Sequence, residues 1–333
     1  MPIAGPMLPN KTEMDNPSTM TGHAGVVVPL HPNPVAAVIV TFNSEDVLAG
    51  LLDSLIDGLT GLEKCEVIVV DNNSRDHSVA IASAHPIGAR IIQTGRNAGY
   101  AAAINIACAT LGANVDVLIL NPDIRLRPDT VQAMRRALIN PGVGVVVPKI
   151  VGESDHLSYS LRCEPSIVTA WSEALLGGTL SGKLRTGEII SDRKRYEQVG
   201  PVDWATGAIL LISAKARHIV GVWDESFFLY SEEVDFMRRV REAELTVEYS
   251  PVAVAFHKGG DTHANPFLFG LSTMNRVRDF AGHHSKFETL VFRMGVTVGE
   301  LVRSWRGPEH RAALDALLRP GKWQKRVESV VGK

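Results

Sequence analysis

The stretch Val117-Leu118-Ile119-Leu120-Asn121-Pro122-Asp123 decides the fold. Its four apolar residues are typical of a short buried strand, and the run is too short for an independent helix. Pro122 has no N–H to donate to a neighbouring strand, so the strand should end at the Asn-Pro-Asp triplet. Asp123 would then lie just past the carboxyl end of a strand, where open α/β sheets bind their ligands. A simple turn is the alternative, because Asn, Pro and Asp all favour turns.

Similar apolar runs precede and follow this stretch and alternate with segments of helical periodicity. The predicted strands are residues 35–41, 66–70, 90–93 and 143–147, and the predicted helices between the first four strands are residues 45–55 and 101–111. Strands that alternate with helices indicate βαβ units. The sequence therefore predicts an α/β fold with a mostly parallel central sheet flanked by helices.

Polar residues follow three of these strands at the point where each strand ends. They are Thr41 and Asn43 after the first strand, Asp71 after the second, and Asp123 after the strand quoted above. Because the carboxyl ends of parallel strands meet at one edge of a sheet, a common ligand site is the simplest interpretation. The turn after the first strand has no glycine-rich phosphate loop, which argues against a dinucleotide-binding fingerprint and against a P-loop.

The second half of the chain is less regular at first. Residues 151–200 have mixed charge and no clear periodicity, and residues 202–212 are predicted to form a loop and then a buried strand. Trp204 and Gly207 lie in that loop, where an aromatic ring can stack on a ligand and a glycine allows a close backbone approach. An ordinary core position is an equally good interpretation of Trp204.

Three carboxylates, Glu232, Glu233 and Asp235, follow the aromatic run at 227–230 and begin a helix predicted to extend to residue 243. Ser231 can cap that helix, and acidic side chains in a first turn interact favourably with the helix dipole. This structural interpretation explains one or two of the acids. A carboxylate near apolar rings has a raised proton affinity, as a general base requires, so the cluster is also a candidate for catalysis.

His257 ends another predicted strand at 252–257 and precedes a Gly-Gly pair, with His263 in the same loop. Most single histidines are structural, but a histidine at a strand end is a better candidate for a ligand. A helix is predicted from residue 265 to about residue 284.

Composition restricts the class of protein. The chain has 333 residues, 45% hydrophobic and 21% charged residues and a net charge of −2, so it carries no signature of nucleic-acid binding. It has no run of 18 apolar residues and no basic segment followed by a long apolar core at its start, so neither a membrane span nor a signal peptide is predicted. Three widely spaced cysteines indicate free thiols in a reducing compartment, and the predicted location is therefore cytoplasmic.

The two ends of the chain differ from its middle. Residues 1–34 are rich in Pro, Gly, Thr and Asn and are predicted to form a flexible leader. Residues 286–333 contain ten Lys or Arg against five Asp or Glu, with hydrophobic residues between them. Such basic amphipathic helices suit peripheral contact with an anionic membrane, and packing against the rest of the protein is the alternative.

Taken together, these motifs resemble the family 2 inverting glycosyltransferases, and most closely their bacterial rhamnosyltransferase-like branch. The resemblance covers residues 35–285. The order and spacing of the motifs that carry it are more specific than any single motif. The motifs are Val-Ile-Val-Thr-Phe-Asn at 38–43, Val-Val-Asp-Asn-Asn-Ser at 69–74, Asn-Ala-Gly-Tyr-Ala at 97–101, Asn-Pro-Asp at 121–123, Trp-Ala-Thr-Gly-Ala at 204–208, Phe-Leu-Tyr-Ser-Glu-Glu-Val-Asp at 228–235 and His-Lys at 257–258.

The resemblance implies a GT-A fold, with a nucleotide-sugar half at 35–150, an acceptor half at 151–285 and C-terminal helices at 286–333. It also implies roles for particular residues. Asp123 would hold a divalent cation, Mg²⁺ or Mn²⁺, with His257 as the second protein ligand, and Trp204 and Gly207 would face the acceptor. The residues implied to bind the donor are Thr41, Asn43, Asp71, Asn97, Gly99 and Asn121.

This chain departs from the family pattern at two places. Asn121 replaces the first acid of the Asp-x-Asp motif, and Glu233 stands where the family has a catalytic aspartate. We expect Glu233 to be the base, with Glu232 and Asp235 as the alternatives.

The activity implied by the resemblance is transfer of a sugar, such as rhamnose, from a dTDP- or UDP-sugar to a glycan or lipid-linked glycan acceptor of the cell wall or surface polysaccharide. The branch and the basic tail together imply peripheral contact with the inner face of the cell membrane. A catalytically degenerate nucleotide-sugar-binding or scaffold protein is the main alternative. A sugar nucleotidyltransferase is disfavoured because it normally needs a glycine-rich loop after the first strand.

Overall fold

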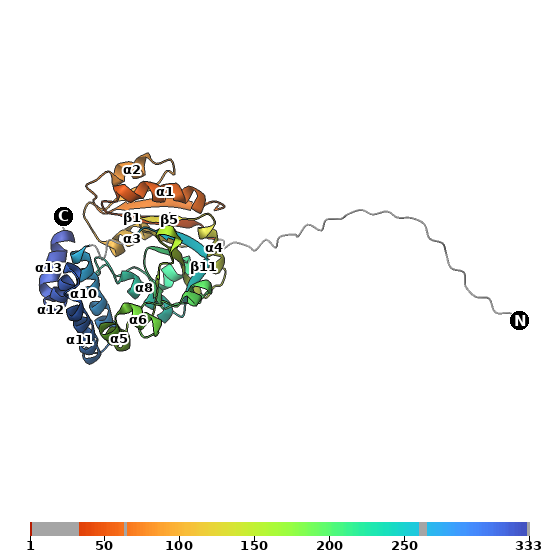
Figure 1. The fold of residues 1–333 in the computed structure, drawn as a ribbon. Coiled ribbons are helices and arrows are strands. Elements are labelled where there is room, and N and C mark those ends of the chain that lie inside the picture. The colour runs from red at the N-terminus through yellow and green to blue at the C-terminus, as the bar shows by residue number, and fades with distance from the viewer. Residues whose placement is uncertain (2–32, 63–64, 260–264, 332–333) are drawn as a thin grey trace.

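Figure 1 shows a computed structural model of the chain, which describes residues 1, 33–62, 65–259 and 265–331. The predicted leader lies outside the described residues except for Met1, Asn33 and Pro34, and His263 lies outside them too.

A nine-stranded sheet forms the centre of the molecule, in the order β3-β2-β1-β4-β10-β6-β11-β5, with β8 paired to β11. Six of the nine strands run in one direction, and β5, β8 and β10 run against them. The predicted α/β class with a mostly parallel sheet is thus confirmed. The strands are β1 Val35–Thr41, β2 Cys65–Asp71, β3 Arg90–Gln93, β4 Asp116–Leu120, β5 Ile124–Leu126, β6 Val143–Val151, β8 Gly200–Pro201, β10 Ile209–Ile212 and β11 Thr246–His257. A separate small sheet pairs β7 (Leu161–Arg162) with β9 (Trp204–Ala205).

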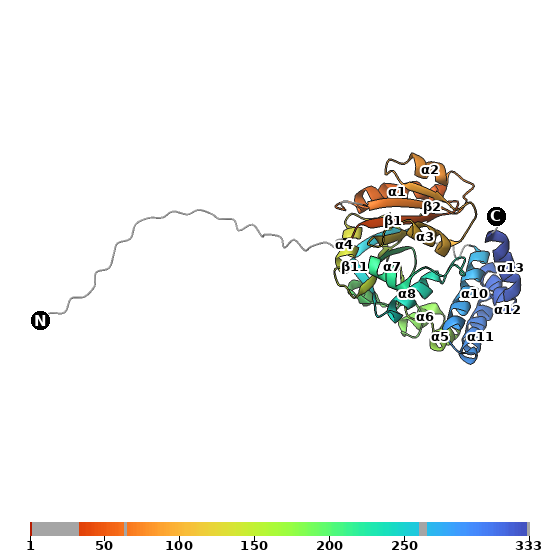
Figure 2. The same cartoon turned by 180° about the vertical axis from the view of Figure 1, so that it is seen from behind.

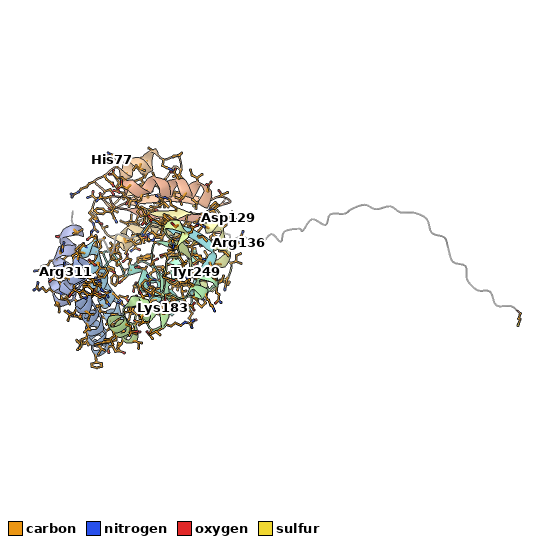
Figure 3. All side chains as sticks on the ribbon, in the orientation of Figure 1. His77, Asp129, Arg136, Lys183, Tyr249 and Arg311 are labelled. Atoms are coloured by element: carbon orange, nitrogen blue, oxygen red, sulfur yellow. The ribbon has the colours of Figure 1, made fainter. Side chains whose placement is uncertain are left out.

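Helices cover both faces of the sheet, which explains why its central strands are apolar throughout (Figures 1 and 2). Successive residues of β1 point to opposite faces, so Val38 joins one hydrophobic cluster and Ile39 the other. The helices on one face are α1 Glu45–Gly58, α2 Ser78–Ala84 and α4 Thr130–Ala137. Those on the other face are α3 Tyr100–Ala109, α7 Ala214–Val220 and α8 Glu232–Glu242. Figure 3 shows Tyr249 of β11 inside the molecule, where it packs edge-on against Tyr196.

Two segments differ from the sequence-based prediction. Strand β11 begins at Thr246, six residues before the predicted start, because a register shift between Ser250 and Val254 accommodates Pro251 while both parts stay paired with β6. The region 151–200 contains helices α5 (Ile167–Leu176) and α6 (Gly178–Lys183), as well as the short 3₁₀ helices η1 (Glu153–Asp155) and η2 (Arg193–Glu197). The helices were missed because α5 buries alanines and exposes leucines, which hides the usual amphipathic pattern.

Four C-terminal helices pack beside the α/β core: α10 Pro266–His283, α11 Lys286–Arg303, α12 Pro308–Leu318 and α13 Pro320–Val331 (Figure 1). Helices α10, α11 and α12 form a third hydrophobic cluster with α5, built on Phe280, Phe292, Val296 and Leu317. None of the helices in the described part of the chain is long and apolar enough to cross a membrane.

A buried ion pair fixes α10 against α8. Arg238 of α8 donates to both carboxylate oxygens of Asp279 of α10, at 2.8 and 2.7 Å, and its Nε donates to Glu164 at 2.7 Å. The bidentate geometry is specific to arginine and defines the relative position of the two helices.

We predict that Asp279→Ala costs about 3–5 kcal/mol in the free energy of unfolding, because it leaves the Arg238 guanidinium buried and without its main partner. Glu66→Ala is the control, since it breaks the exposed ion pair with Arg90, which should contribute about 0–1 kcal/mol. Denaturant unfolding of both variants measures the difference. Equal and small losses would mean that the buried pair does not hold α8 in place.

Candidate active site

The ends of β1 and β2 meet at one edge of the sheet. Thr41 pairs with Asp71 across the two strands, and its hydroxyl donates to Asp71 Oδ1 at 3.1 Å. Asp71 Oδ2 accepts from the Ser74 N–H at 3.0 Å, and Asn43 binds the same loop through the Arg75 N–H at 2.9 Å. These hydrogen bonds hold a group of polar side chains in fixed positions at the edge of the sheet where the sequence predicted a site.

Asp123 follows β4, on the other side of β1. The antiparallel pairing of β5 with β11 sets His257 opposite Ile124, so that His257 Nε2 lies 3.1 Å from Asp123 Oδ2. The Gly259 N–H also donates to this oxygen, at 3.2 Å. Burial alone would raise the pKa of the Asp123 carboxyl, but the hydrogen bond and charge of His257 outweigh burial and lower that pKa. Asp123 is therefore ionised at neutral pH.

The donor set of this pair fits a divalent cation. A carboxylate oxygen and an imidazole nitrogen are both common metal ligands, and both side chains remain accessible, at 18% and 22% exposure. The residues that the structure describes contain no cluster of three or more metal-ligating side chains. Two protein ligands are enough where substrate phosphates and water complete the coordination sphere, as is usual for Mg²⁺.

Tyr100 connects the Asp123 side of the site with the acidic cluster on α8. Its hydroxyl donates to Asn121 Oδ1 at 2.8 Å and lies 3.2 Å from the Gly207 carbonyl oxygen. Burial raises the pKa of Tyr100 well above its ordinary value, and the negative charges of Glu232, Glu233 and Asp123 add to the effect. Tyr100 was not among the site residues expected from the sequence, although it lies in the Asn-Ala-Gly-Tyr-Ala motif.

Gly99 allows the segment before α8 to approach the loops that follow β2 and β3. Its φ of 91° favours glycine, and a Cβ at this position would lie 2.4 Å from the Phe228 carbonyl oxygen. The same oxygen accepts from the Tyr100 N–H at 3.0 Å, and the Gly99 carbonyl accepts from Asn72 Nδ2 at 3.0 Å. Asn72 is a second residue without an assigned role in the sequence analysis. Its buried Oδ1 has no hydrogen-bond partner within the described residues.

Glu233 lies directly against Gly207. A Cβ on Gly207 would be 3.3 Å from Glu233 Cβ and 3.7 Å from its carboxyl carbon. Burial raises the pKa of Glu233 to about 7, close to the value that suits a general base at neutral pH. A raised proton affinity was the reason why the sequence pointed to this cluster, and the role of Glu233 as a base stays a prediction.

The two neighbouring acids are in different situations. Burial, followed by the charge of Glu233, raises the pKa of Glu232 well above its ordinary value, and Glu232 Oε2 has no hydrogen-bond partner among the described atoms. Asp235 is held by Arg239, with Nη2 at 2.7 Å, and lies 3.8 Å from His283 Nε2. Glu233 alone of the three is partly exposed.

The capping interpretation of the acids is only partly correct. All three lie in the first turn of α8, where the helix dipole favours negative charge. Ser231 occupies the N-cap position, but its side chain makes no capping hydrogen bond. Tyr230 and Ser231 have φ values of 70° and 75°, which is unfavourable for non-glycine residues, and Asn275 of α10 donates to the carbonyl oxygens of Leu229 and Tyr230. Tertiary contacts from α10, rather than a side-chain cap, therefore stabilise the backbone conformation of residues 229–231 before α8.

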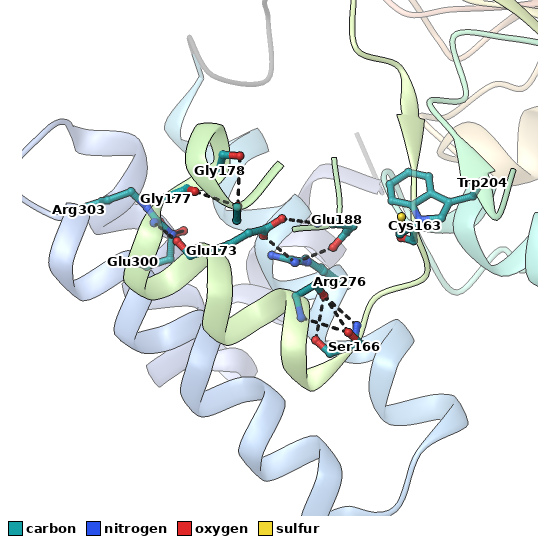
Figure 4. Close-up of polar contacts among 12 residues, drawn as sticks. Cys163, Ser166, Glu173, Gly177, Gly178, Glu188, Trp204, Arg276, Glu300 and Arg303 are labelled. Atoms are coloured by element: carbon teal, nitrogen blue, oxygen red, sulfur yellow. Dashed lines mark hydrogen bonds and ion pairs between the residues drawn. The ribbon is translucent and has the colours of Figure 1, made fainter. Parts of the chain in front are cut away.

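Trp204 is buried, and its indole N–H donates to the Cys163 carbonyl oxygen at 3.0 Å (Figure 4). The Arg162 guanidinium lies 5.8 Å from the centre of its ring. These contacts resemble a core position more than an open stacking platform. Contact with an acceptor stays a prediction for Trp204, as does contact with a donor for the buried Asn97.

A cavity of about 660 Å³ lies between the core and the C-terminal helices, and its lining includes Ala98, Phe228 and Asn275. The described residues that line this cavity do not include Asp123, Glu232 or Glu233. The carboxylates and the strand ends, rather than this cavity, therefore mark the candidate active site.

Comparisons with known proteins agree with this geometry. Residues 36–184 match the glycosyl transferase family 2 domain. The chain is 31% identical over 245 residues to an N-acetylglucosaminyl-diphospho-decaprenol L-rhamnosyltransferase of Mycobacterium tuberculosis, and the alignment covers 70% of this chain and 78% of that protein.

Two solved structures are similar in fold. A mannosyltransferase of Pyrobaculum calidifontis in complex with GDP-Man and Mn²⁺ aligns with a TM-score of 0.54 at 16% identity, over 89% of this chain and 84% of that one. Residues 1–349 of TarS from S. aureus, in complex with UDP-GlcNAc, align with a TM-score of 0.52 at 15% identity, over 90% and 84% of the two chains. The fold is thus that of the GT-A glycosyltransferases.

We predict that Glu233→Gln stabilises the protein at pH 8 and has little effect at pH 5. The ordinary pKa of 4.5 applies to the unfolded chain and about 7 to the folded protein, so the folded state binds more protons in this window. Stability therefore falls as pH rises from about 4.5 through about 7, and the variant should regain about 1–3 kcal/mol above that window.

Thermal unfolding at both pH values measures the effect, with Glu242→Gln on the exposed side of the same helix as the control. A Glu233→Gln protein that is no more stable than the control at pH 8 would contradict the raised pKa.

Proposed function

The chain belongs to glycosyl transferase family 2, and we propose that it transfers a sugar from a dTDP- or UDP-sugar to a hydroxyl of a cell-wall or surface-polysaccharide acceptor, with inversion of the anomeric centre. We propose rhamnose as the sugar and a lipid-linked glycan as the acceptor, because the relative from Mycobacterium tuberculosis is named as a rhamnosyltransferase of a diphospho-decaprenol-linked sugar. Such an acceptor lies at a membrane surface, so the protein would work in the cytoplasm in peripheral contact with the inner face of the cell membrane.

One observation carries this proposal. Tyr100 joins the loop after β4, which carries Asp123, to Gly207, and Gly207 packs against Glu233. A residue suited to a diphosphate-bound cation and a residue suited to proton removal are therefore connected through one set of contacts.

In the proposed organisation, residues 35–150 bind the donor and residues 151–285 bind the acceptor. Asp71 would accept hydrogen bonds from the pyrimidine base, with Thr41 and Asn43 beside it. Gly99 and Asn121 would line the sugar-diphosphate, together with Asn97. Gly207 would lie under the acceptor next to Glu233, and Trp204 would support that side of the site.

Asp123 and His257 would hold the divalent cation, Mg²⁺ or Mn²⁺. When bound, the cation neutralises the charge that develops on the departing nucleoside diphosphate. The lowered pKa of Asp123 keeps its carboxyl ionised for this role across the neutral range.

Glu233 would act as the general base. Its carboxylate takes the proton of the acceptor hydroxyl while that oxygen bonds to the anomeric carbon and the bond from this carbon to the diphosphate breaks. A single displacement of this kind inverts the anomeric centre. Asp235 is engaged with Arg239, and Glu232 is more deeply buried, so both are worse placed to exchange protons with a substrate.

We predict that donor binding depends on the metal and on Asp123. A panel of dTDP-, UDP- and GDP-sugars titrated by calorimetry with Mn²⁺, Mg²⁺ or EDTA should show binding of one class of donor. Asp123→Asn should weaken that binding more than about tenfold, since it removes the charge that holds the cation. Asp129→Asn, the same change in the turn before α4, is the control.

Donor binding that is unaffected by EDTA and by Asp123→Asn would mean that Asp123 and His257 do not bind a cation. No binding of any donor by folded protein would argue against the transferase as a whole.

We predict that Glu233→Gln lowers the transfer rate by about 10²–10⁴-fold and leaves donor affinity unchanged, because only proton removal is lost. In the wild type, kcat/KM should rise with pH up to about 7 and then level off, as Glu233 loses its proton. Glu242→Gln is the matched control. Transfer at the wild-type rate by Glu233→Gln would exclude Glu233 as the base, and donor binding without any turnover by the wild type would favour the scaffold alternative.

A further inference from the structure

Helix α11 exposes a continuous apolar stripe on its outer side. Phe287, Leu290, Met294, Leu301 and Trp305 follow each other in steps of three, four or seven residues, so they lie on one side of the helix and of the turn that follows it. Each of them is between 50% and 76% exposed. Outward-facing positions of a helix on a globular protein are normally polar, so this stripe requires an explanation.

The opposite side of α11 is the one that packs on the protein. Phe292 and Val296 are buried in the cluster with α10 and α12, and Gly295 lies against Trp171 of α5. The helix is therefore apolar on two sides and packs with only one of them. The hydrophobic residues of the predicted basic amphipathic tail therefore fall into two groups. Leu317 of α12 and Trp323 of α13 are buried, whereas the stripe on α11 is exposed.

Helices α5 and α6 extend the apolar surface. The indole N–H of Trp171 donates to the Val291 carbonyl oxygen at 3.1 Å, which fixes α5 along α11. Leu176 and Leu180 are exposed and share a shallow pocket with Lys183 and with Arg306, in the turn after α11. All three helices lie at the same end of the molecule in Figures 1 and 2. We call the α11 stripe together with Leu176 and Leu180 the α5–α11 face.

Three exposed positive charges lie at the borders of this face. Lys183, Arg306 and Lys286 are exposed at its borders, and Lys183 lies with α6 toward the lower side of Figure 3. The Arg306 guanidinium lies 5.5 Å from the ring of Trp305. The acid at the start of α11, Glu288, is engaged by Ser285 in the capping box. Tryptophan beside arginine is typical of membrane–water interfaces, where the ring enters the headgroup region and the cation binds lipid phosphate.

Partly buried ion pairs and a hydrogen bond tie the face to the rest of the protein. Arg276 of α10 binds Glu173 of α5 at 2.9 Å and Glu188 at 2.6 Å, and Arg303 of α11 donates to the Glu173 carbonyl oxygen at 3.0 Å (Figure 4). Helix α10 also carries Asn275, which holds the turn before Glu232 and Glu233. The orientation of the face therefore fixes the orientation of the acidic cluster.

We infer that the α5–α11 face docks on the surface of an anionic lipid bilayer, with α11 lying in the headgroup region. Apolar side chains fringed by lysine and arginine match such a surface in both polarity and charge. A second copy of the chain fits less well, because a symmetric contact through this face would bring like charges together. Presentation of a lipid-linked acceptor to Glu233 rests on the proposed function, whereas binding to lipid does not.

The test is co-sedimentation of the full chain with vesicles of phosphatidylcholine alone or mixed with phosphatidylglycerol. Wild type should bind the anionic vesicles, and Phe287→Ser combined with Leu290→Ser should weaken that binding at least about tenfold. Lys183→Gln combined with Arg306→Gln should remove the preference for anionic vesicles. Val222→Ser combined with Val252→Ser, at equally exposed apolar positions on other elements, should bind as wild type does.

Donor binding should be the same in all these variants, which separates this inference from the proposed function. The inference is overturned if wild type ignores anionic vesicles, or if the Phe287/Leu290 variant binds them as well as wild type does. It is also overturned if sedimentation analysis shows a wild-type dimer that this variant dissociates, because the face is then an interface between copies.

Discussion

Two adjacent carboxyl groups, Glu232 and Glu233, are held largely out of water at the start of α8, and much of the surrounding structure serves to keep them there. Burial disfavours the charged form of each, and the charge of Glu233 adds to the proton affinity of Glu232. A helix start with this cost would shift toward solvent unless other contacts held it. Arg238 fixes α8 to α10 through Asp279, and Asn275 of α10 holds the carbonyl groups just before the carboxylates.

The same turn connects the two halves of the candidate site. Its Phe228 carbonyl oxygen lies so close to Gly99 that a residue with a side chain would not fit at position 99. The next residue, Tyr100, contacts Asn121 and Gly207 through its hydroxyl group. The acidic cluster of α8 is thereby connected to the loop after β4, which carries Asp123. A glycine and a tyrosine far apart in the chain from these acids thus determine where the acids can act.

The helices at the C-terminal end join this unit to an exposed apolar surface. Interior packing uses one side of α11, and the other side remains free, bordered by Lys286 and Arg306. The contacts of Arg276 and Arg303 join α5, α10 and α11, so the surface is tied to the helix that holds the acidic cluster.

The sequence by itself determined the α/β class, most strand positions and the polar strand ends, because apolar runs and the residues that stop them are local signals. It also identified Asp123, His257 and Glu233 as candidates, since their motifs are short and ordered along the chain. Other features depended on residues distant in sequence. The start of β11 depended on its pairing with β6. The helices in residues 151–200 lacked a clear amphipathic pattern, because α5 exposes leucines. The contacts of Tyr100 and Asn72 form between side chains that meet only in the folded chain. Only the tertiary structure set the raised pKa of Glu233 near 7 and the engagement of Asp235 with Arg239, because burial and ion pairing are properties of the packed protein rather than of a segment.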